Sequence, residues 1–234
     1  MSNEHFDFKQ FSIKQDRCAM KVGTDAVLLG AWAANTMHDA QGTMHVLDIG
    51  TGSGVIALML AQQFAKAQIT GIDIDETAIR QAQANFAKSP WSERLSAQCI
   101  SLQEFTLHPT PLHPYSLITS NPPYFRSSLA CPDPTRHQAR HTDTLSYDEL
   151  IRCSAVLLAP NGVLALVLPG EAQEDILTLA AREGLYPWRL THVVTSPNKP
   201  AKRILIALTK EKREMEEDTL VLAHDHPMFK AFYL

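Results

Sequence analysis

The tetrapeptide Asn121-Pro122-Pro123-Tyr124, near the middle of the chain, carries the clearest chemistry in the sequence. Its two prolines fix their own backbone angles and have no N–H group to donate. The Asn121 side-chain oxygen and the Pro122 carbonyl oxygen therefore form a rigid pair of hydrogen-bond acceptors beside the flat ring of Tyr124. Such a pair can hold both hydrogens of a planar amino group and aim its lone pair at an electrophile, so alignment matters more than a strong base. The alternative is a proline-rich turn that only ends a strand.

A glycine-rich turn forms the second candidate site. The segment Asp48 to Gly54 reads DIGTGSG and stands between an apolar run and a helical pattern. Its glycines let a ligand come close to the backbone, next to the free N–H groups that begin the helix. Asp73 ends the next expected strand, where its carboxylate can accept hydrogen bonds from both hydroxyls of a ribose. Asp75 is expected to cap the following helix. The alternative is a strand–helix turn without a ligand. The candidate ligand-binding residues here are Asp48, Gly50, Gly52, Gly54 and Asp73.

These residues need a framework that brings them together, and the hydrophobic pattern predicts one. Short apolar runs alternate with amphipathic stretches, which is typical of a parallel sheet covered by helices on both faces. The expected strands are His45–Ile49, Ile69–Ile74, Leu95–Ile100, Tyr115–Ser120, Val163–Leu168, Trp188–Thr195 and Arg203–Thr209, and the expected helices are Thr24–Ala34, Val55–Phe64, Glu76–Ala87, Tyr147–Leu158 and Glu171–Glu183. The last two strands have no room for a helix between them, so we expect them to be antiparallel. Ligands bind beyond the carboxyl ends of such strands, where both candidate sites would meet.

Composition excludes several classes of protein. The formal net charge is −4, from 21 basic and 25 acidic residues, which excludes a histone-like binder but allows a local basic patch. The four cysteines form no CxxC pair, so we expect neither a disulfide framework nor a zinc ribbon. His137 and His141 have no third ligand at suitable spacing, and we expect no metal. The absence of a signal peptide and of a membrane-spanning stretch favours a cytoplasmic protein without membrane contact. No pattern bears on the oligomeric state.

The motifs carry a family resemblance. The glycine turn followed by Asp73 resembles motif I of S-adenosylmethionine-dependent methyltransferases of class I, and NPPY resembles motif IV of those that methylate amino groups. Residues 11–32 (FSIKQDRCAMKVGTDAVLLGAW), DIGTGSG, GIDID, NPPYF, the RH…ARH loop and the terminal FYL together resemble the bacterial family that methylates N6 of adenine 37 in the anticodon loop of valine tRNA. The resemblance covers essentially the whole chain. It implies a Rossmann-like α/β fold with a seven-stranded, mostly parallel sheet, S-adenosyl-L-methionine as cofactor, and the tRNA anticodon stem-loop as partner.

The resemblance also implies roles on the cofactor side. Asp73 would hold the cofactor's ribose, and Gln103 lies in the region where a residue, usually acidic, contacts the cofactor's adenine. Thr24 and Asp25 would be neighbours of the cofactor, the alternative for both being helix capping. Residues 1–44 would then cover cofactor and substrate, residues 45–210 would form the catalytic domain, and residues 211–234 would be a tail docked on it.

On the substrate side the resemblance implies that Asn121 and the Pro122 carbonyl align the amine while Tyr124 stacks on the base. The other residues expected beside the substrate are Pro123, Phe125, Arg126, Arg136 and Arg140. Arginines placed there can hold the phosphates around an extruded nucleotide, and single-stranded loops suit such recognition. A solvated loop is the alternative interpretation of this basic segment.

Several functions share NPPY and stay open. A protein glutamine N5-methyltransferase has the motif but does not require the basic loop after it, and an rRNA guanine N2-methyltransferase is a further alternative. A non-catalytic RNA-binding module that kept the fold is the alternative outside enzymes, although the intact Asn121 and Tyr124 argue against it. DNA is disfavoured as a substrate because no separate DNA-recognition domain is evident.

Overall fold

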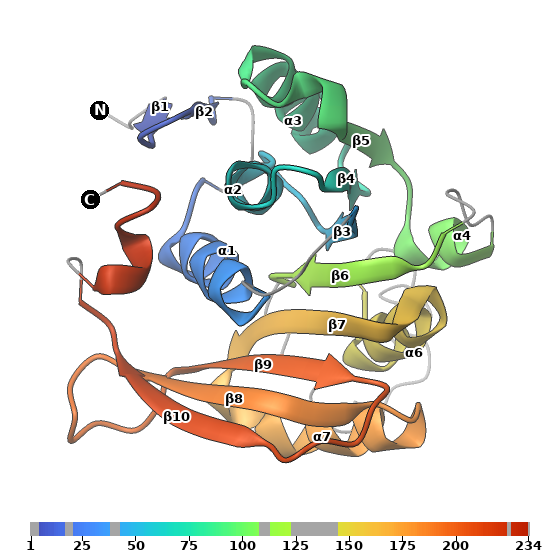
Figure 1. Cartoon of the computed structure of the whole chain (residues 1–234), viewed down its shortest axis with the longest axis vertical. Helices are drawn as coiled ribbons and strands as arrows, with labels where there is room; N and C mark the ends of the chain where they lie inside the picture. Colours follow the sequence, from blue (N-terminus) through green and yellow to red (C-terminus); the bar gives the residue numbers. More distant parts are fainter. Residues whose placement is uncertain are drawn as a thin grey trace, which may run out of the picture.

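An eight-stranded sheet forms the centre of the protein, in the order β10-β8-β9-β7-β6-β3-β4-β5 (Figure 1). The computed structural model describes residues 5–16, 21–37, 43–107, 113–122, 145–223 and 226–233. The strands of the sheet are β3 (His45–Ile49), β4 (Gln68–Asp73), β5 (Leu95–Cys99), β6 (Tyr115–Ser120), β7 (Leu158–Pro169), β8 (Tyr186–Val194), β9 (Arg203–Thr209) and β10 (Glu216–Val221). Neighbouring strands are parallel except where β9 pairs with β7 and β8. The predicted antiparallel pairing of β8 with β9 is therefore confirmed, although β10, parallel to β8, forms the end of the sheet.

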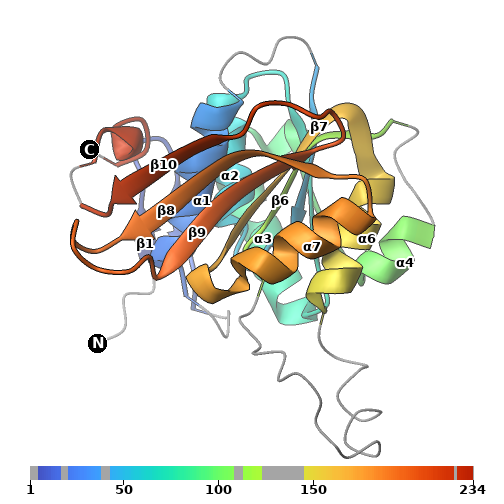
Figure 2. The same cartoon turned by 90° about the horizontal axis from the view of Figure 1, so that it is seen from below.

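Helices cover both faces of this sheet. They are α1 (Thr24–Thr36), α2 (Val55–Gln63), α3 (Glu76–Lys88), α4 (Leu102–Leu107), α6 (Tyr147–Leu157) and α7 (Gln173–Arg182), with short 3₁₀ turns η1 (Ser92–Arg94), η2 (Gly170–Ala172) and η3 (Pro227–Phe229). The helices α1 to α3 share a hydrophobic cluster with Val46, whereas α4, α6 and α7 share a second cluster with Leu47 (Figure 2). Adjacent strand residues thus face opposite layers, as the pleat requires. Among the described residues, no helix is long and apolar enough to cross a membrane.

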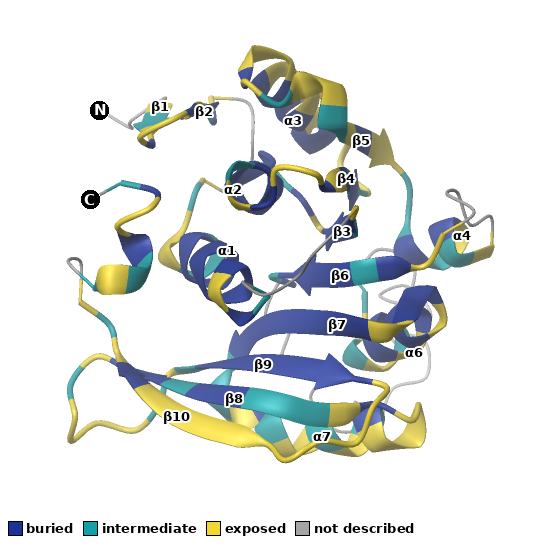
Figure 3. Cartoon of the chain, in the orientation of Figure 1, coloured by how far each residue is buried: buried dark blue, intermediate teal, exposed yellow. Residues whose placement is uncertain are grey.

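The sheet has one strand more than predicted. All seven expected strands are present, and the eighth, β10, comes from the segment after Lys210. Its sequence EEDTLV is polar, and only Leu220 of it is buried, so no apolar pattern marks it as a strand. Figure 3 shows β10 mostly exposed beside β8, whereas β9 and β7, farther into the sheet, are mostly buried. A charged edge strand of this kind disfavours pairing with another chain.

The two ends of the chain meet beside α2. The strands β1 (His5–Asp7) and β2 (Ser12–Lys14) form an antiparallel hairpin. The Lys9 N–H donates to the Phe232 carbonyl at 2.7 Å, and the Gln62 Nε2 of α2 donates to the Ala231 carbonyl at 2.6 Å. Phe229 and Phe232 are buried. The terminal segment therefore fastens the hairpin to the helix that follows the glycine turn.

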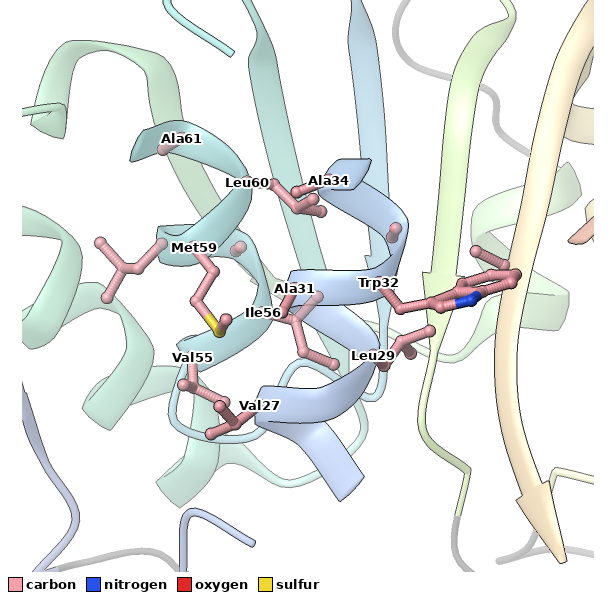
Figure 4. Close-up of a cluster of buried hydrophobic side chains, with 14 of the residues drawn as sticks. Val27, Leu29, Ala31, Trp32, Ala34, Val55, Ile56, Met59, Leu60 and Ala61 are labelled. Atoms are coloured by element: carbon pink, nitrogen blue, oxygen red, sulfur yellow. The ribbon is translucent and has the colours of Figure 1, made fainter. Parts of the chain in front are cut away.

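The packing of α1 on α2 sets the position of the start of α1. Val27, in the first turn of α1, lies against Val55, the first residue of α2 (Figure 4). Trp32 points away from α2, and its Nε1 donates to the Thr191 Oγ1 of β8 at 2.9 Å. Both helices are apolar along most of their length, which suits helices buried between the sheet and the chain ends. Since Val55 directly follows the glycine turn, the start of α1 lies near that turn.

Candidate functional site

The glycine turn joins the carboxyl end of β3 to the start of α2. Its three glycines have positive φ angles of 69° at Gly50, 54° at Gly52 and 83° at Gly54, a region that other residues rarely adopt. The N–H groups of Gly50 and Thr51 donate to the Ile72 carbonyl of β4 at 2.9 and 3.0 Å. A Cβ atom on Gly54 would lie 2.4 Å from the Phe86 ring. The turn is thus locked against both β4 and α3.

Asp48 supports this turn from inside the protein. The residue has 0% exposure, and its carboxylate accepts hydrogen bonds from the Thr51 Oγ1 at 2.7 Å and the Thr119 Oγ1 at 2.8 Å. Burial raises the pKa of the Asp48 carboxyl to about 6, although the two threonine hydroxyls act to lower it. The side chain therefore ties the glycine turn to β6.

Asp73 stands at the carboxyl end of β4, across from the turn. Its Oδ2 accepts a hydrogen bond from the Gly52 N–H at 3.0 Å, and its Oδ1 accepts one from the Asp75 N–H at 3.0 Å. The residue is half-buried, and each carboxylate oxygen keeps a lone pair for a ligand. The Asp75 Oδ1 accepts from the Thr77 N–H at 2.8 Å, so its predicted capping role is confirmed.

Asn85, a buried residue of α3, belongs to the same network and was missed from the sequence. Its Nδ2 donates to the Ser53 carbonyl in the turn at 2.8 Å and to the Lys14 carbonyl of β2 at 3.0 Å. Its Oδ1 accepts from the Lys14 N–H at 3.0 Å. One amide thus fastens the amino-terminal hairpin to the glycine turn. The only available signal was a polar residue on the buried side of an amphipathic helix, which does not reveal its partners.

Asn121 and Pro122 follow β6, the strand next to β3. The Ser120 Oγ donates to the Ile49 carbonyl at 2.9 Å, which holds the ends of these two strands together. Asn121 is half-buried and Pro122 is buried. The structure therefore brings the predicted acceptor pair to the edge that carries the glycine turn. Outside the described residues lie the other predicted substrate neighbours, Pro123, Tyr124, Phe125, Arg126, Arg136 and Arg140.

Gln103 has a structural partner. The residue is on α4, and its Nε2 donates to the Glu149 Oε1 of α6 at 3.1 Å. Glu149 also accepts from the Ser146 N–H in a capping box, and hydrogen bonds from Gln103 and Ser146 lower the Glu149 pKa although burial opposes them. The amide thus holds α4 against α6, and its contact with the cofactor's adenine stays a prediction.

Thr24 and Asp25 begin α1, but neither caps it. The N-cap residue is Gly23, and no side chain makes a capping hydrogen bond, so the capping interpretation is wrong. Instead the Asp25 Oδ2 accepts a hydrogen bond from the Arg203 Nε of β9 at 2.9 Å. Asp25 is in the first turn, where a carboxylate is favoured by the helix dipole. The pair fixes the start of α1 to the far half of the sheet.

Together these groups lie at one end of the parallel strands. The ends of β3, β4 and β6 carry the turn, the Asp73 carboxylate and the Asn121 acceptor pair. A Cβ atom on Gly50 or Gly52 would meet nothing within 4 Å among the described residues, so space lies open beside the turn. An acceptor for ribose hydroxyls beside glycines that let a ligand approach the backbone fits S-adenosyl-L-methionine. No group of three potential metal ligands occurs in the described part of the chain.

Comparisons with known proteins agree with this chemistry. The model of the methyltransferase small domain matches residues 26–178. The tRNA1(Val) (adenine(37)-N6)-methyltransferase of Parabacteroides distasonis is 51% identical over 209 residues, 89% of this chain and 85% of the relative. The protein of the same name from Bacteroides fragilis is 45% identical over 94% of this chain and 90% of the relative.

Solved structures show the same fold. The crystal structure of a predicted O-methyltransferase from Agrobacterium tumefaciens aligns with a TM-score of 0.64 at 18% identity, covering 87% of this chain and 89% of that one. TrmN from Thermus thermophilus aligns with a TM-score of 0.54 at 24% identity, covering 77% of this chain and 48% of that one. With the edge described above, these matches establish that the chain has the class I methyltransferase fold and belongs to the family of tRNA1(Val) (adenine(37)-N6)-methyltransferases.

Proposed function

We propose that this protein methylates N6 of adenine 37 in the anticodon stem-loop of valine tRNA, with S-adenosyl-L-methionine as the methyl donor. The observation that carries the proposal is the position of Asn121 and Pro122 at the end of β6, which Ser120 bonds to the end of β3 beside the glycine turn. The names of the relatives support adenine N6 over glutamine N5 or guanine N2. When bound, the cofactor supplies an electrophilic methyl group on a positively charged sulfur.

On the substrate side, the chain's task is alignment. The Asn121 Oδ1 and the Pro122 carbonyl accept the two hydrogens of the adenine amino group, which turns its lone pair away from the ring and toward the cofactor. Tyr124 stacks on the base, and Pro123, Phe125, Arg126, Arg136 and Arg140 contact the nucleotide and its phosphates. No side chain has to remove the proton before transfer, because the extra proton leaves the product afterwards.

On the cofactor side, the chain provides a preorganised surface. Asp73 accepts hydrogen bonds from the ribose hydroxyls, using the lone pairs that Gly52 and Asp75 leave free. Gly50, Gly52 and Gly54 let the ligand approach the backbone, and Asp48 acts through the turn that it holds. Gln103, Thr24 and Asp25 line the cofactor's remaining sides.

The test is to map the product. The protein is incubated with methyl-labelled cofactor, total bacterial tRNA and release-factor protein, and the products are analysed by mass spectrometry. We expect N6-methyladenosine at position 37 of valine tRNA. Label in glutamine N5 or in guanine N2, or no transfer to any RNA or protein, would overturn the proposal in favour of one of the alternatives.

A further inference from the structure

The connection between β8 and β9, residues 195–202, lies at the binding edge and has no assigned role. We call it the β8–β9 turn. Pro169, the last residue of β7, is opposite Arg203, the first residue of β9. Because β7 is parallel to β6, this turn is at the same end of the sheet as Asn121 (Figure 1). β9 is two strands from β6, so the axes of these two strands are about 10 Å apart at a strand spacing of ~4.8 Å.

Backbone contacts hold this turn in place. The Lys202 N–H donates to the Val193 carbonyl at 3.1 Å, and the Gly170 N–H donates to the Lys202 carbonyl at 3.3 Å. The Lys199 N–H donates to the Ser196 carbonyl at 3.0 Å. A Cβ atom on Gly170 would lie 2.6 Å from the Ala201 carbonyl, so this approach is as close as glycine allows. The turn is a fixed platform for its side chains.

The platform carries unneutralised positive charge. Lys199 and Lys202 are exposed, and neither ammonium group has an ion-pair partner among the described residues. The neighbouring carboxylate of Asp25 is paired with Arg203. The charge of Glu171, next to Gly170, acts on Tyr147 of α6, whose pKa is raised mainly by burial and further by Glu171 and Asp175. Both lysine ammonium groups are therefore available to bind an anion.

We propose that Lys199 and Lys202 bind backbone phosphates of the RNA substrate beside the nucleotide held at Asn121. The inference rests on the proposed function and adds a second contact surface to it. A base taken out of its stack stays tied to phosphates on both sides, so the strand that carries it runs past the groups beside Asn121. Lysines act here as point charges that position the RNA without reading its sequence.

The experiment compares two pairs of charge reversals. The test variant is Lys199→Glu/Lys202→Glu, and the matched control is Lys66→Glu/Lys212→Glu. The control makes the same change of net charge at exposed lysines that lie at the opposite ends of the strands, before β4 and after β9. Binding of a fluorescent anticodon stem-loop is measured by anisotropy between 50 and 200 mM salt, and cofactor binding by calorimetry. We expect the test variant to lose at least about tenfold in RNA affinity and its salt slope to fall by roughly 1.5 to 2. Cofactor affinity should not change.

The outcomes separate the two proposals. If the test variant binds RNA as the control does, with the same salt slope, the phosphate contact is wrong even when adenine 37 is methylated. If the wild-type protein binds the stem-loop but does not methylate it, and the test variant binds more weakly, the proposed function is wrong and the phosphate contact at the β8–β9 turn is supported. Lys199→Arg/Lys202→Arg should keep wild-type affinity, and its loss would also contradict a purely electrostatic contact.

Discussion

The two halves of the binding edge are built in different ways. In the cofactor half, at the ends of β3 and β4, Asp48, Asp73 and Asn85 are buried or half-buried, and each is bonded to the backbone or side chains of the glycine turn. In the substrate half, at the ends of β6, β7 and β8, Asn121 is half-buried while Lys199 and Lys202 are exposed.

The difference is expected if one half binds the cofactor and the other binds RNA, as proposed above. A small molecule of fixed shape is best held by groups that are already locked in place, whereas a long polyanion is held by exposed charges over a wide area. Changes in the cofactor half should therefore alter stability and cofactor affinity. Changes in the substrate half should alter turnover or RNA affinity and leave the cofactor bound.

Asn121→Ala is the strongest test of this separation. Loss of one of the two acceptors leaves the adenine amine planar and misaligned, so turnover should fall about 100- to 1000-fold. Cofactor affinity should stay within about threefold of wild type, since the cofactor half is untouched. Methyl-transfer kinetics and calorimetry measure the two quantities. Near-normal turnover would show that the alignment mechanism is wrong, and a large loss of cofactor affinity would show that the halves are not independent.

Gly54→Ala should damage the cofactor half through its packing. The alanine combines a φ angle of 83° with a Cβ atom 2.4 Å from the Phe86 ring. We expect a loss of about 3 kcal/mol in the free energy of unfolding, from backbone strain and overpacking together. Gly50→Ala is the matched control, because its φ is 69° but its Cβ would contact none of the described residues within 4 Å, and it should lose only about 1 kcal/mol. Equal losses in urea unfolding would mean that Phe86 does not constrain the turn.

Local signals explain what could be predicted from the sequence. The bounds of Tyr115–Ser120 and Arg203–Thr209 were predicted correctly because each is an apolar run with polar or proline-containing neighbours. The Asp75 cap was predictable because it depends on a residue two positions away. The glycine turn was predictable for the same reason, since the three glycines with positive φ angles lie within one short segment.

Long-range contacts explain what could not be predicted. Asn85 is 71 residues from Lys14, and Asp25 is 178 residues from Arg203. Nothing near Asp25 in the sequence distinguishes an ion pair with a distant strand from a helix cap. Likewise β10 begins with four polar residues and buries only Leu220, and its strand conformation depends on pairing with β8.

Asp73→Ala should come next in size, with a loss of cofactor affinity of about 10- to 100-fold, the value of hydrogen bonds to a charged acceptor. The control is Asp75→Ala, which removes the cap of α3 and should cost about 1 kcal/mol of stability with cofactor affinity unchanged. Calorimetric titration with S-adenosyl-L-methionine compares the two. Unchanged affinity in Asp73→Ala would remove Asp73 from the ribose site, and equal losses would assign the effect to the start of α3.

The smallest expected effect is a pH dependence that originates inside the cofactor half. Burial raises the pKa of the Asp48 carboxyl from 3.8 to about 6, so between these values the folded protein holds a proton that the unfolded chain has released. Stability therefore falls as the pH rises through this window, by about 1 kcal/mol between pH 5 and pH 6, since the slope for one proton is at most ~1.4 kcal/mol per pH unit.

Asp48→Asn isolates this contribution, because the amide keeps an acceptor for one threonine hydroxyl and does not titrate. The free energy of urea unfolding is measured for both proteins from pH 4.5 to 7, and the difference between them is plotted against pH. We expect the wild type to lose stability relative to the variant as the pH rises, with the change ending near pH 7. A difference that is flat, or that grows in favour of the wild type, would mean that the Asp48 carboxylate is ionised throughout and that the threonine hydroxyls outweigh burial in the support of the turn.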